Sequence, residues 1–160
     1  MDLLVNIRHA NADDCGAVLR VLSVAFEPSQ AQYTPEAYTD TILTPDLFIQ
    51  RLSRMTVLIA ATESGEIVGT IACGMSGATE GHLRGMAVLP DFHGLGIAPK
   101  LLAAAETELS ASGARYITLD TTEPLLRAVR FYTKHGYAKT GRVQDFFGMR
   151  LHEYRKELLP

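Results

Sequence analysis

The sequence predicts an α/β domain with a mixed sheet, in the order βα(α)βββαβαββ. Two observations lead to this class. β-rich apolar runs alternate along the chain with segments whose apolar residues recur at helical spacing. In addition, residues 82–120 form a strand–helix–strand unit, which requires a right-handed crossover and a local parallel pair of strands. At 160 residues, with 47% hydrophobic and 21% charged residues, we expect one domain over residues 1–160.

The N-terminal third begins with a strand over residues 3–7, followed by a helix. Asn11 and the two acids after Ala12 supply a cap and negative charge for the start of this helix. Its apolar face consists of Cys15, Val18, Leu19, Leu22 and Phe26. Two Thr-Pro-acid sequences then place a hydroxyl before a proline, which predicts two short helices across residues 35–54.

The later elements follow from β-rich runs and from turn residues. Ser64 and Gly65 join two β-rich runs into a hairpin, and Pro90 ends the next strand. Gly113 and Gly136 mark the ends of two helices. The expected strands cover residues 56–62, 66–75, 82–89, 115–120, 137–143 and 149–154, and the expected helices cover residues 96–112 and 124–135.

Charge and composition exclude several kinds of partner. A net charge of −3 does not suit a protein that neutralises nucleic-acid phosphates, so we expect a small substrate. The N-terminal residues lack the basic start and the long apolar run of a signal peptide, and no uncharged stretch reaches the ~18 residues that span a bilayer. We therefore expect a cytoplasmic protein without a membrane partner. Cys15 and Cys73 have no ligand-spaced Cys or His beside them, so we expect no metal.

A glycine-rich turn, residues 93–98, lies between a predicted strand and a predicted helix. Gly94 and Gly96 allow the backbone to turn tightly and to approach a ligand without a Cβ in the way. The following helix has free N–H groups and a partial positive charge at its start. The turn is therefore a candidate anion-binding site.

Three interpretations of this turn compete at the level of spacing. A dinucleotide-binding turn needs a third glycine three residues after Gly96, where this chain has Pro99. A Walker loop needs a glycine directly before its lysine, but Pro99 precedes Lys100. A plain strand-to-helix turn without a ligand is the third interpretation, and these residues alone leave it open.

The turn resembles the pyrophosphate-binding motif of the Gcn5-related N-acetyltransferase (GNAT) family, which is Gln or Arg, any two residues, Gly, any residue, then Gly or Ala. His93, Gly96 and Ala98 occupy the defined positions, with His in place of Gln or Arg. Residues 83–90 look like the family's fourth strand, whose backbone pairs with the pantetheine arm. The resemblance implies that acetyl-CoA is held by Met86, Ala87, Val88, His93, Gly94, Leu95, Gly96, Ile97, Ala98 and Lys100.

A later segment, residues 125–137, is similar to the family's segment in which Asn is followed by Ala, Tyr, Lys and Gly-Phe. The matching residues are Ala128, Tyr132, Lys134, Gly136 and Tyr137. Leu125 stands where the family has Asn, so one polar contact to the cofactor arm is missing. The resemblance covers nearly the whole chain and implies a GNAT-like mixed, mostly antiparallel sheet flanked by helices.

The resemblance implies direct acetyl transfer from acetyl-CoA to a primary amine of a small molecule or a peptide. Tyr132 matches the family's general acid, which gives a proton to the departing thiolate. The acceptor must lose a proton, because an amine of pKa ~10 is mostly charged at neutral pH. Glu27, beside the loop that lines the family's acceptor site, is the first candidate base, and Glu80, His82 and Asp120 are the alternatives.

Acceptor choice and assembly are less constrained by the sequence. In the family, the loops that match residues 27–36 and 142–148 select the acceptor, and Arg142 is a candidate partner for a substrate carboxylate. A non-catalytic acyl-CoA-binding sensor or regulatory module is the alternative function, although the retained Tyr132 favours an enzyme. A structural domain without any cofactor is a third possibility, and a homodimer is one assembly that the sequence leaves open.

Overall fold

The sheet of this protein is mixed. The computed structural model describes residues 2–123 and 125–158. Seven strands form one sheet in the order β1-β2-β3-β4-β5-β7-β6. The β4–β5 pair is parallel, and the other neighbouring pairs are antiparallel. This arrangement confirms the expected mostly antiparallel sheet and the parallel pair within residues 82–120.

The order of helices and strands is the predicted one. The strands are β1 (Val5–His9), β2 (Thr56–Thr62), β3 (Ile67–Met75), β4 (Glu80–Val88), β5 (Tyr116–Thr122), β6 (Ala138–Phe146) and β7 (Met149–Glu157). The helices are α1 (Cys15–Phe26), α2 (Pro35–Ile42), α3 (Pro45–Arg54), α4 (Ile97–Ala111) and α5 (Leu126–Lys134). Short 3-10 turns cover Ala12–Asp14, Glu27–Gln32 and Pro90–Phe92.

Several boundaries differ from the expected ones because pairing, not local pattern, sets them. Strand β1 begins at Val5, which pairs with Thr62 at the end of β2, whereas the N–H of Leu3 bonds to the carbonyl of Leu95. Strand β4 begins at Glu80 because Glu80 already pairs with β5. The start of the helix predicted at residue 124 lies outside the described residues, and α5 begins at Leu126.

The starts of α2 and α3 confirm the role predicted for the Thr-Pro sequences. The hydroxyl of Thr34 accepts a hydrogen bond from the N–H of Ala37, and the hydroxyl of Thr44 does the same from Leu47. In each case the following proline stands in the first turn, where its missing N–H costs nothing. These caps fix where the two short helices begin.

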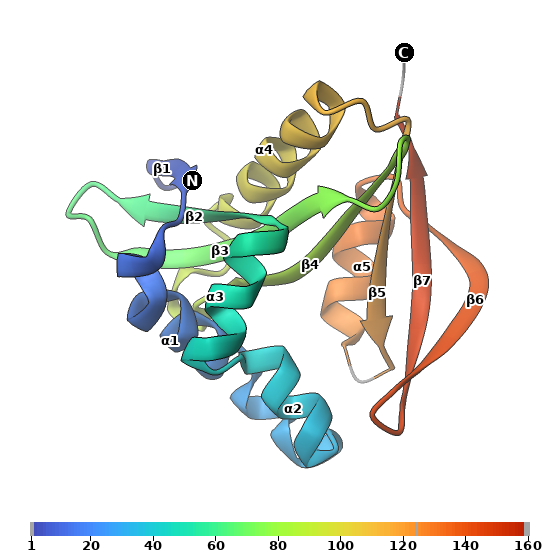
Figure 1. Ribbon diagram of the computed structural model, residues 1–160. Helices are drawn as coiled ribbons and strands as arrows, with labels where there is room; N and C mark the ends of the chain where they lie inside the picture. The colour runs from blue at the N-terminus through green and yellow to red at the C-terminus, as the bar shows by residue number, and fades with distance from the viewer. Residues whose placement is uncertain (1, 124, 159–160) are drawn as a thin grey trace.

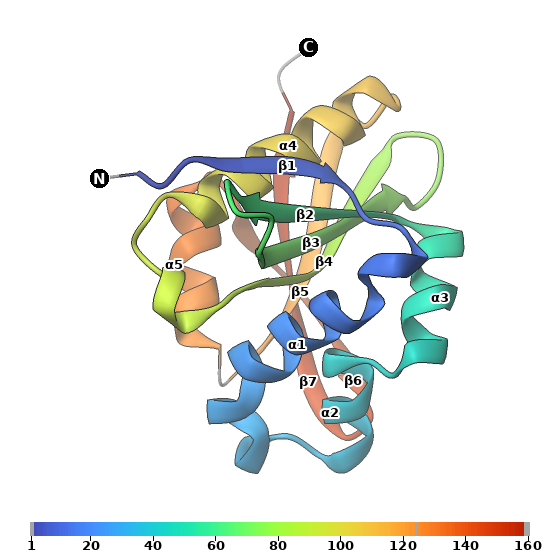
Figure 2. The ribbon, with the colours of Figure 1, turned by 90° about the vertical axis from the view of Figure 1, so that its left-hand side faces the viewer.

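The helices lie on both sides of the sheet (Figures 1 and 2). Helices α1, α2 and α3 cover one face, and α4 and α5 lie on the other. Gly69 and Gly81 let α4 pack closely, because a Cβ on either would be 2.9 Å from a leucine methyl group of α4. Within the described residues, no helix is long and apolar enough to span a membrane.

Candidate active site

The parallel strands β4 and β5 separate partway along their length. Their pairing runs from Glu80 opposite Tyr116 to Leu83 opposite Leu119 and then stops. Strand β4 nevertheless continues to Val88, bonded to β3 on its other edge. The edge of β4 that faces β5 over residues 84–88 therefore has no strand partner in the described sheet, and it can pair with a ligand.

A bulge marks the beginning of this separation. The β3–β4 register shifts between Thr70 and Ala72, and Gly85 has a φ of +64°. A side chain would be strained at this φ, so glycine suits the bend. The bulge turns β4 away from β5 and opens the space between them.

A cleft of about 840 Å³ fills the gap between the separated strands. Its walls come from β4, the glycine-rich turn, the start of α4, the end of β5, helix α5 and the end of α1. The predicted cofactor residues that line it are Met86, Ala87, Val88, His93, Gly94, Gly96, Ile97 and Ala98. The structure thus brings the strand, the turn and the later helix of the sequence motifs into one site.

The glycine-rich turn has the backbone conformation of an anion site. Gly94 and Gly96 have φ of +78° and +81°, and Gly96 is the N-cap of α4. The N–H groups of Ile97 and Ala98 have no intrahelical acceptor, Pro99 has no N–H, and the N–H of Lys100 donates to the carbonyl of Gly96 at 3.4 Å. The dipole of α4 adds positive potential at the same place.

Two residues of the turn and its helix, His93 and Lys100, have contacts that the sequence did not predict. The Nε2 nitrogen of His93 lies 2.9 Å from the carbonyl oxygen of Val88, so the ring ties the turn to the end of β4. Lys100 Nζ donates to the carbonyl of Leu3 at 3.0 Å. Leu95 and Lys100 are absent from the described cleft lining, and their predicted cofactor contacts stay predictions.

Tyr132 enters the cleft from α5. It is 7% exposed and packs edge-on against Phe131 and Tyr137. Burial raises the pKa of its phenol, so the hydroxyl keeps its proton at neutral pH. Its hydroxyl bonds to no residue in the described part of the chain, whereas the neighbouring Tyr137 donates to Glu106 at 2.7 Å. Tyr132 is therefore a neutral proton donor without a protein acceptor.

A histidine–carboxylate pair lies where β4 and β5 separate. His82 Nε2 is 3.6 Å from Asp120 Oδ2, and Asp120 lines the cleft. Burial lowers the pKa of His82 and raises the pKa of Asp120, while the two groups act on each other in the opposite sense. Both pKa shifts arise because a buried charge is poorly solvated. With its imidazole neutral at neutral pH, the pair is suited to accepting a proton.

The other two predicted bases, Glu27 and Glu80, are absent from the described lining of the cleft. Glu27 is the first residue of the 3-10 turn after α1 and is exposed. Its neighbours Phe26 and Pro28 line the cleft, but Glu27 is absent from the described lining. Glu80 accepts hydrogen bonds from Tyr116 and Thr118. The catalytic role of Glu27 stays a prediction.

The two segments expected to choose the acceptor, residues 27–36 and 142–148, have contacts with β7 and with each other. Arg142 lies 3.7 Å from Glu153 of β7. Thr34 donates to the carbonyl of Phe147, which joins the start of α2 to the β6–β7 turn. The two predicted acceptor loops therefore meet in the structure, and their role in acceptor choice stays a prediction.

The sequence did not single out Arg51 or Thr118. Arg51 belongs to α3, and its guanidinium lies against Gly85 of the bulge. Thr118 bonds to His82 across the β4–β5 pair. An arginine near a helix end and a threonine in a strand are ordinary in sequence, and only the packing of distant segments gives them a place near the site.

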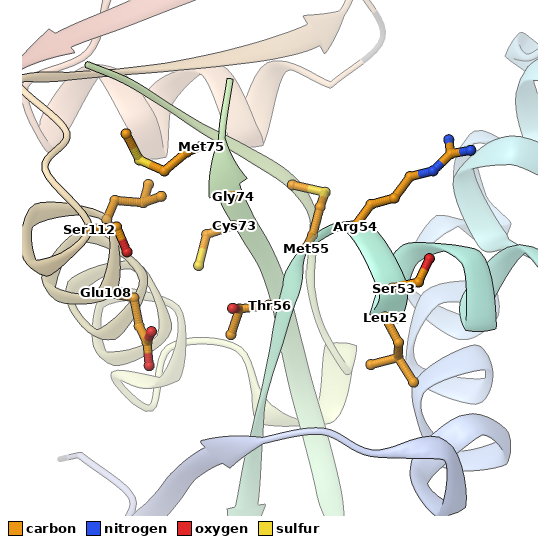
Figure 3. A pocket seen from close by; sticks show the side chains of 11 residues that line it. Leu52, Ser53, Arg54, Met55, Thr56, Cys73, Gly74, Met75, Glu108 and Ser112 are labelled. Atoms are coloured by element: carbon orange, nitrogen blue, oxygen red, sulfur yellow. The ribbon is translucent and has the colours of Figure 1, made fainter. Parts of the chain in front are cut away.

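A second pocket, of about 310 Å³, lies between the ends of α3 and α4 and strands β2 and β3 (Figure 3). Cys73 and Thr56 face Glu108 and Ser112 across it. Burial, and to a lesser extent the charge of Glu108, raises the pKa of the Cys73 thiol to about 11. The thiol is therefore protonated and unreactive at neutral pH, and the motif residues line the larger cleft instead.

Comparison with known proteins identifies the family of this chain. A sequence profile described as the Acetyltransferase (GNAT) family matches residues 18–137. The N-alpha-acetyltransferase MAK3 of Arabidopsis thaliana is 26% identical over 102 residues, which cover 62% of this chain and 54% of that protein. This chain thus spans about half the length of the curated relative that it matches.

Solved structures share the fold at low identity. A GCN5-related N-acetyltransferase from Rhodopseudomonas palustris has 24% identity and a TM-score of 0.79, covering 99% of this chain and 98% of its own. The PaiA N-acetyltransferase of Thermoplasma acidophilum, solved in complex with coenzyme A, has 18% identity and a TM-score of 0.79, covering 98% and 100%. Because the family profile spans most of the chain, including the glycine-rich turn and Tyr132, the chain belongs to the GNAT acetyltransferase family.

Proposed function

We propose that this protein is an acetyl-CoA-dependent N-acetyltransferase that moves the acetyl group directly to a primary amine of a small molecule or a peptide. The observation that carries the proposal is the cleft between the separated β4 and β5, which joins the glycine-rich turn to Tyr132. A sensor needs only the turn, whereas a buried, neutral and unbonded phenol in the same cleft is suited to catalysis.

The residues of the cleft suit the parts of acetyl-CoA. The unpaired edge of β4 over residues 84–88 offers backbone groups to the amides of the pantetheine arm, much as a neighbouring strand would. The turn and the first N–H groups of α4 offer donors to the pyrophosphate. At Gly94 no atom lies within 4 Å of the place that a Cβ would occupy, whereas at Gly96 the carboxyl group of Asp2 lies within 3 Å of that place, so acetyl-CoA would have to displace Asp2 there.

The reaction requires a proton to leave the amine and a proton to reach the sulfur. Acetyl-CoA supplies an activated acetyl thioester, whose C–S bond breaks as the C–N bond forms. Tyr132 holds the proton for the departing thiolate. For the amine proton, the geometry favours the His82–Asp120 pair over the exposed Glu27, because Asp120 lines the cleft.

Two measurements test this function. Acetyl-CoA at 100 times its dissociation constant is expected to raise the free energy of unfolding by about 2.7 kcal/mol, which a thermal-shift assay detects. Release of thiol with a panel of amines then distinguishes an enzyme from a sensor. The panel includes peptides with a free α-amine, because the curated relative is named as an N-alpha-acetyltransferase. A thermal shift without thiol release from any amine would show an acyl-CoA-binding sensor instead.

A substitution in the turn locates the cofactor. Gly96→Asp places a carboxylate at the anion site, and we expect it to abolish the thermal shift by acetyl-CoA. Gly65→Asp controls for backbone strain, because Gly65 also has a positive φ, +90°, but lies in the β2–β3 turn. At Gly96 the new side chain also meets the carboxyl group of Asp2, which adds a second negative charge at the same place. Both variants carry backbone strain, and only Gly96→Asp should lose the ligand.

A further inference from the structure

Arg51 lies against the cleft wall at Gly85 and, within the described residues, has no counter-ion. Arg51 projects from α3 toward the bulge, where its Nη1 is 2.6 Å from the place that a Cβ on Gly85 would occupy. Gly85 is part of the cleft wall. The guanidinium therefore lies beside the point at which β4 begins to leave β5.

The charges that act on Arg51, those of Arg84 and Asp40, pair with each other, and the charged residues of the neighbouring strands are paired as well. Arg84 bonds to Asp40 at 3.1 Å, and Arg142 lies 3.7 Å from Glu153. Asp120 faces His82. Arg51 forms no ion pair and donates no hydrogen bond to any residue in the described parts of the chain. Arg51 is therefore a partly buried cation whose N–H donors have no acceptor within the described residues.

An unpaired cation in such a place is costly. Burial and the charge of Arg84 lower the pKa of Arg51 to about 10, while Asp40 raises it, so the guanidinium remains charged at neutral pH. Most of its hydration is lost, and its N–H donors have no protein acceptor in return. A bound anion would supply both the missing charge and the missing acceptors.

We propose that Arg51 binds a carboxylate of the acceptor, so that the substrate is an amine that also carries a carboxylate. The planar guanidinium presents two parallel N–H donors, which match the two oxygens of a carboxylate. Arg142, the other candidate for this role, is largely exposed and lies 3.7 Å from the carboxylate of Glu153. This inference rests on the proposed function, because it names the acceptor class of the same site.

Matched acceptors test the assignment. The common L-amino acids are compared with the same amino acids as C-terminal amides, which keep the amine but lack the carboxylate. Wild-type protein is expected to prefer an acid over its amide in kcat/KM by about 10-fold or more, as a charged hydrogen bond allows. O-phosphoethanolamine is included beside ethanolamine, and a preference for the phosphate over every carboxylate would overturn the assignment.

Variants of α3 separate binding from folding. Arg51→Gln should lower kcat/KM for the acids by about 10- to 100-fold, through KM, and leave the amides within about twofold. Arg51→Lys keeps the charge but not the planar pair of donors, and an intermediate loss is expected. Arg54→Gln is the control, because Arg54 is exposed on the same helix and lines the second pocket. An equal loss for acids and amides in Arg51→Gln would show a structural role and overturn the proposal.

The failure of this inference is distinguishable from failure of the enzyme assignment. If wild-type protein acetylates acids and amides equally, the carboxylate site is wrong and the acetyltransferase stands. If it acetylates neither, the binding of the same acids and amides to coenzyme A-saturated protein is measured by thermal shift, and this measurement tests the carboxylate site by itself. A shift with an acid but not its amide, lost in Arg51→Gln, supports the site, and equal or absent shifts overturn it.

Discussion

The Nδ1 nitrogen of His82 lies 2.8 Å from the hydroxyl oxygen of Thr118 across the parallel β4–β5 pair. The same hydroxyl donates to the carboxylate of Glu80 at 2.7 Å, so its oxygen accepts a hydrogen bond from Nδ1–H. A neutral His82 then has its lone pair on Nε2, the nitrogen that faces Asp120. The parallel pairing thus fixes the tautomer of His82 and directs its basic nitrogen toward the acid of the cleft.

His82 is expected to titrate below 6.5, the ordinary value of an imidazole, because burial lowers its pKa. In Asp120→Asn the pKa should decrease further, because the charge of Asp120 raises it in the native protein. The imidazole resonances followed by NMR against pH measure both values. A pKa of 6.5 or higher in the wild-type protein, or an upward change in the variant, would contradict the environment described for this pair.

Asp120→Asn should lower kcat by about 100-fold or more if the His82–Asp120 pair takes the amine proton. Glu27→Gln is the comparison, because Glu27 is the base predicted from the sequence and its side chain is exposed. Steady-state rates with one acceptor at saturating acetyl-CoA measure both effects. A larger loss in Glu27→Gln than in Asp120→Asn would assign the base to the 3-10 turn instead.

Tyr132→Phe should lower kcat by about 100-fold or more and leave acetyl-CoA affinity nearly unchanged, because only a proton donor is removed. Its stability should change little, since the hydroxyl has no acceptor in the described structure. Tyr137→Phe is the matched control: it loses the bond to Glu106, which costs about 1 kcal/mol of unfolding free energy, and it should keep full activity. Wild-type turnover in Tyr132→Phe would exclude the acid role.

Two glycine-to-alanine substitutions should have opposite effects on stability. Gly81→Ala places a Cβ 2.9 Å from Leu109 Cδ1 and is expected to cost about 1–3 kcal/mol of unfolding free energy through overpacking. Gly16→Ala lies in α1 with no atom within 4 Å of the new Cβ, and it should gain about 0.5–1 kcal/mol from helix propensity. Urea unfolding measures both changes in the free energy of unfolding. Changes of the same sign in the two variants would contradict the packing of α4 on β4.

The elements that local chemistry specifies were predictable. The Thr-Pro caps of α2 and α3 and the glycine-rich turn depend on residues next to one another in the chain, and the structure contains each where it was expected. The boundaries of β1 and β4 were not predictable, because they depend on the length of partner strands. The same distinction holds at the site, where the motif residues were predictable but their contacts were not.

The sequence by itself determined the family, the position of the candidate anion-binding turn and the candidate acid Tyr132, because each depends on spacing within a short segment. Only the tertiary structure decided how these segments combine. The separation of β4 from β5, the pairing of His82 with Asp120 and the approach of Arg51 to Gly85 join residues from segments far apart in the chain. Such contacts arise from strand register and helix packing, which no local pattern encodes.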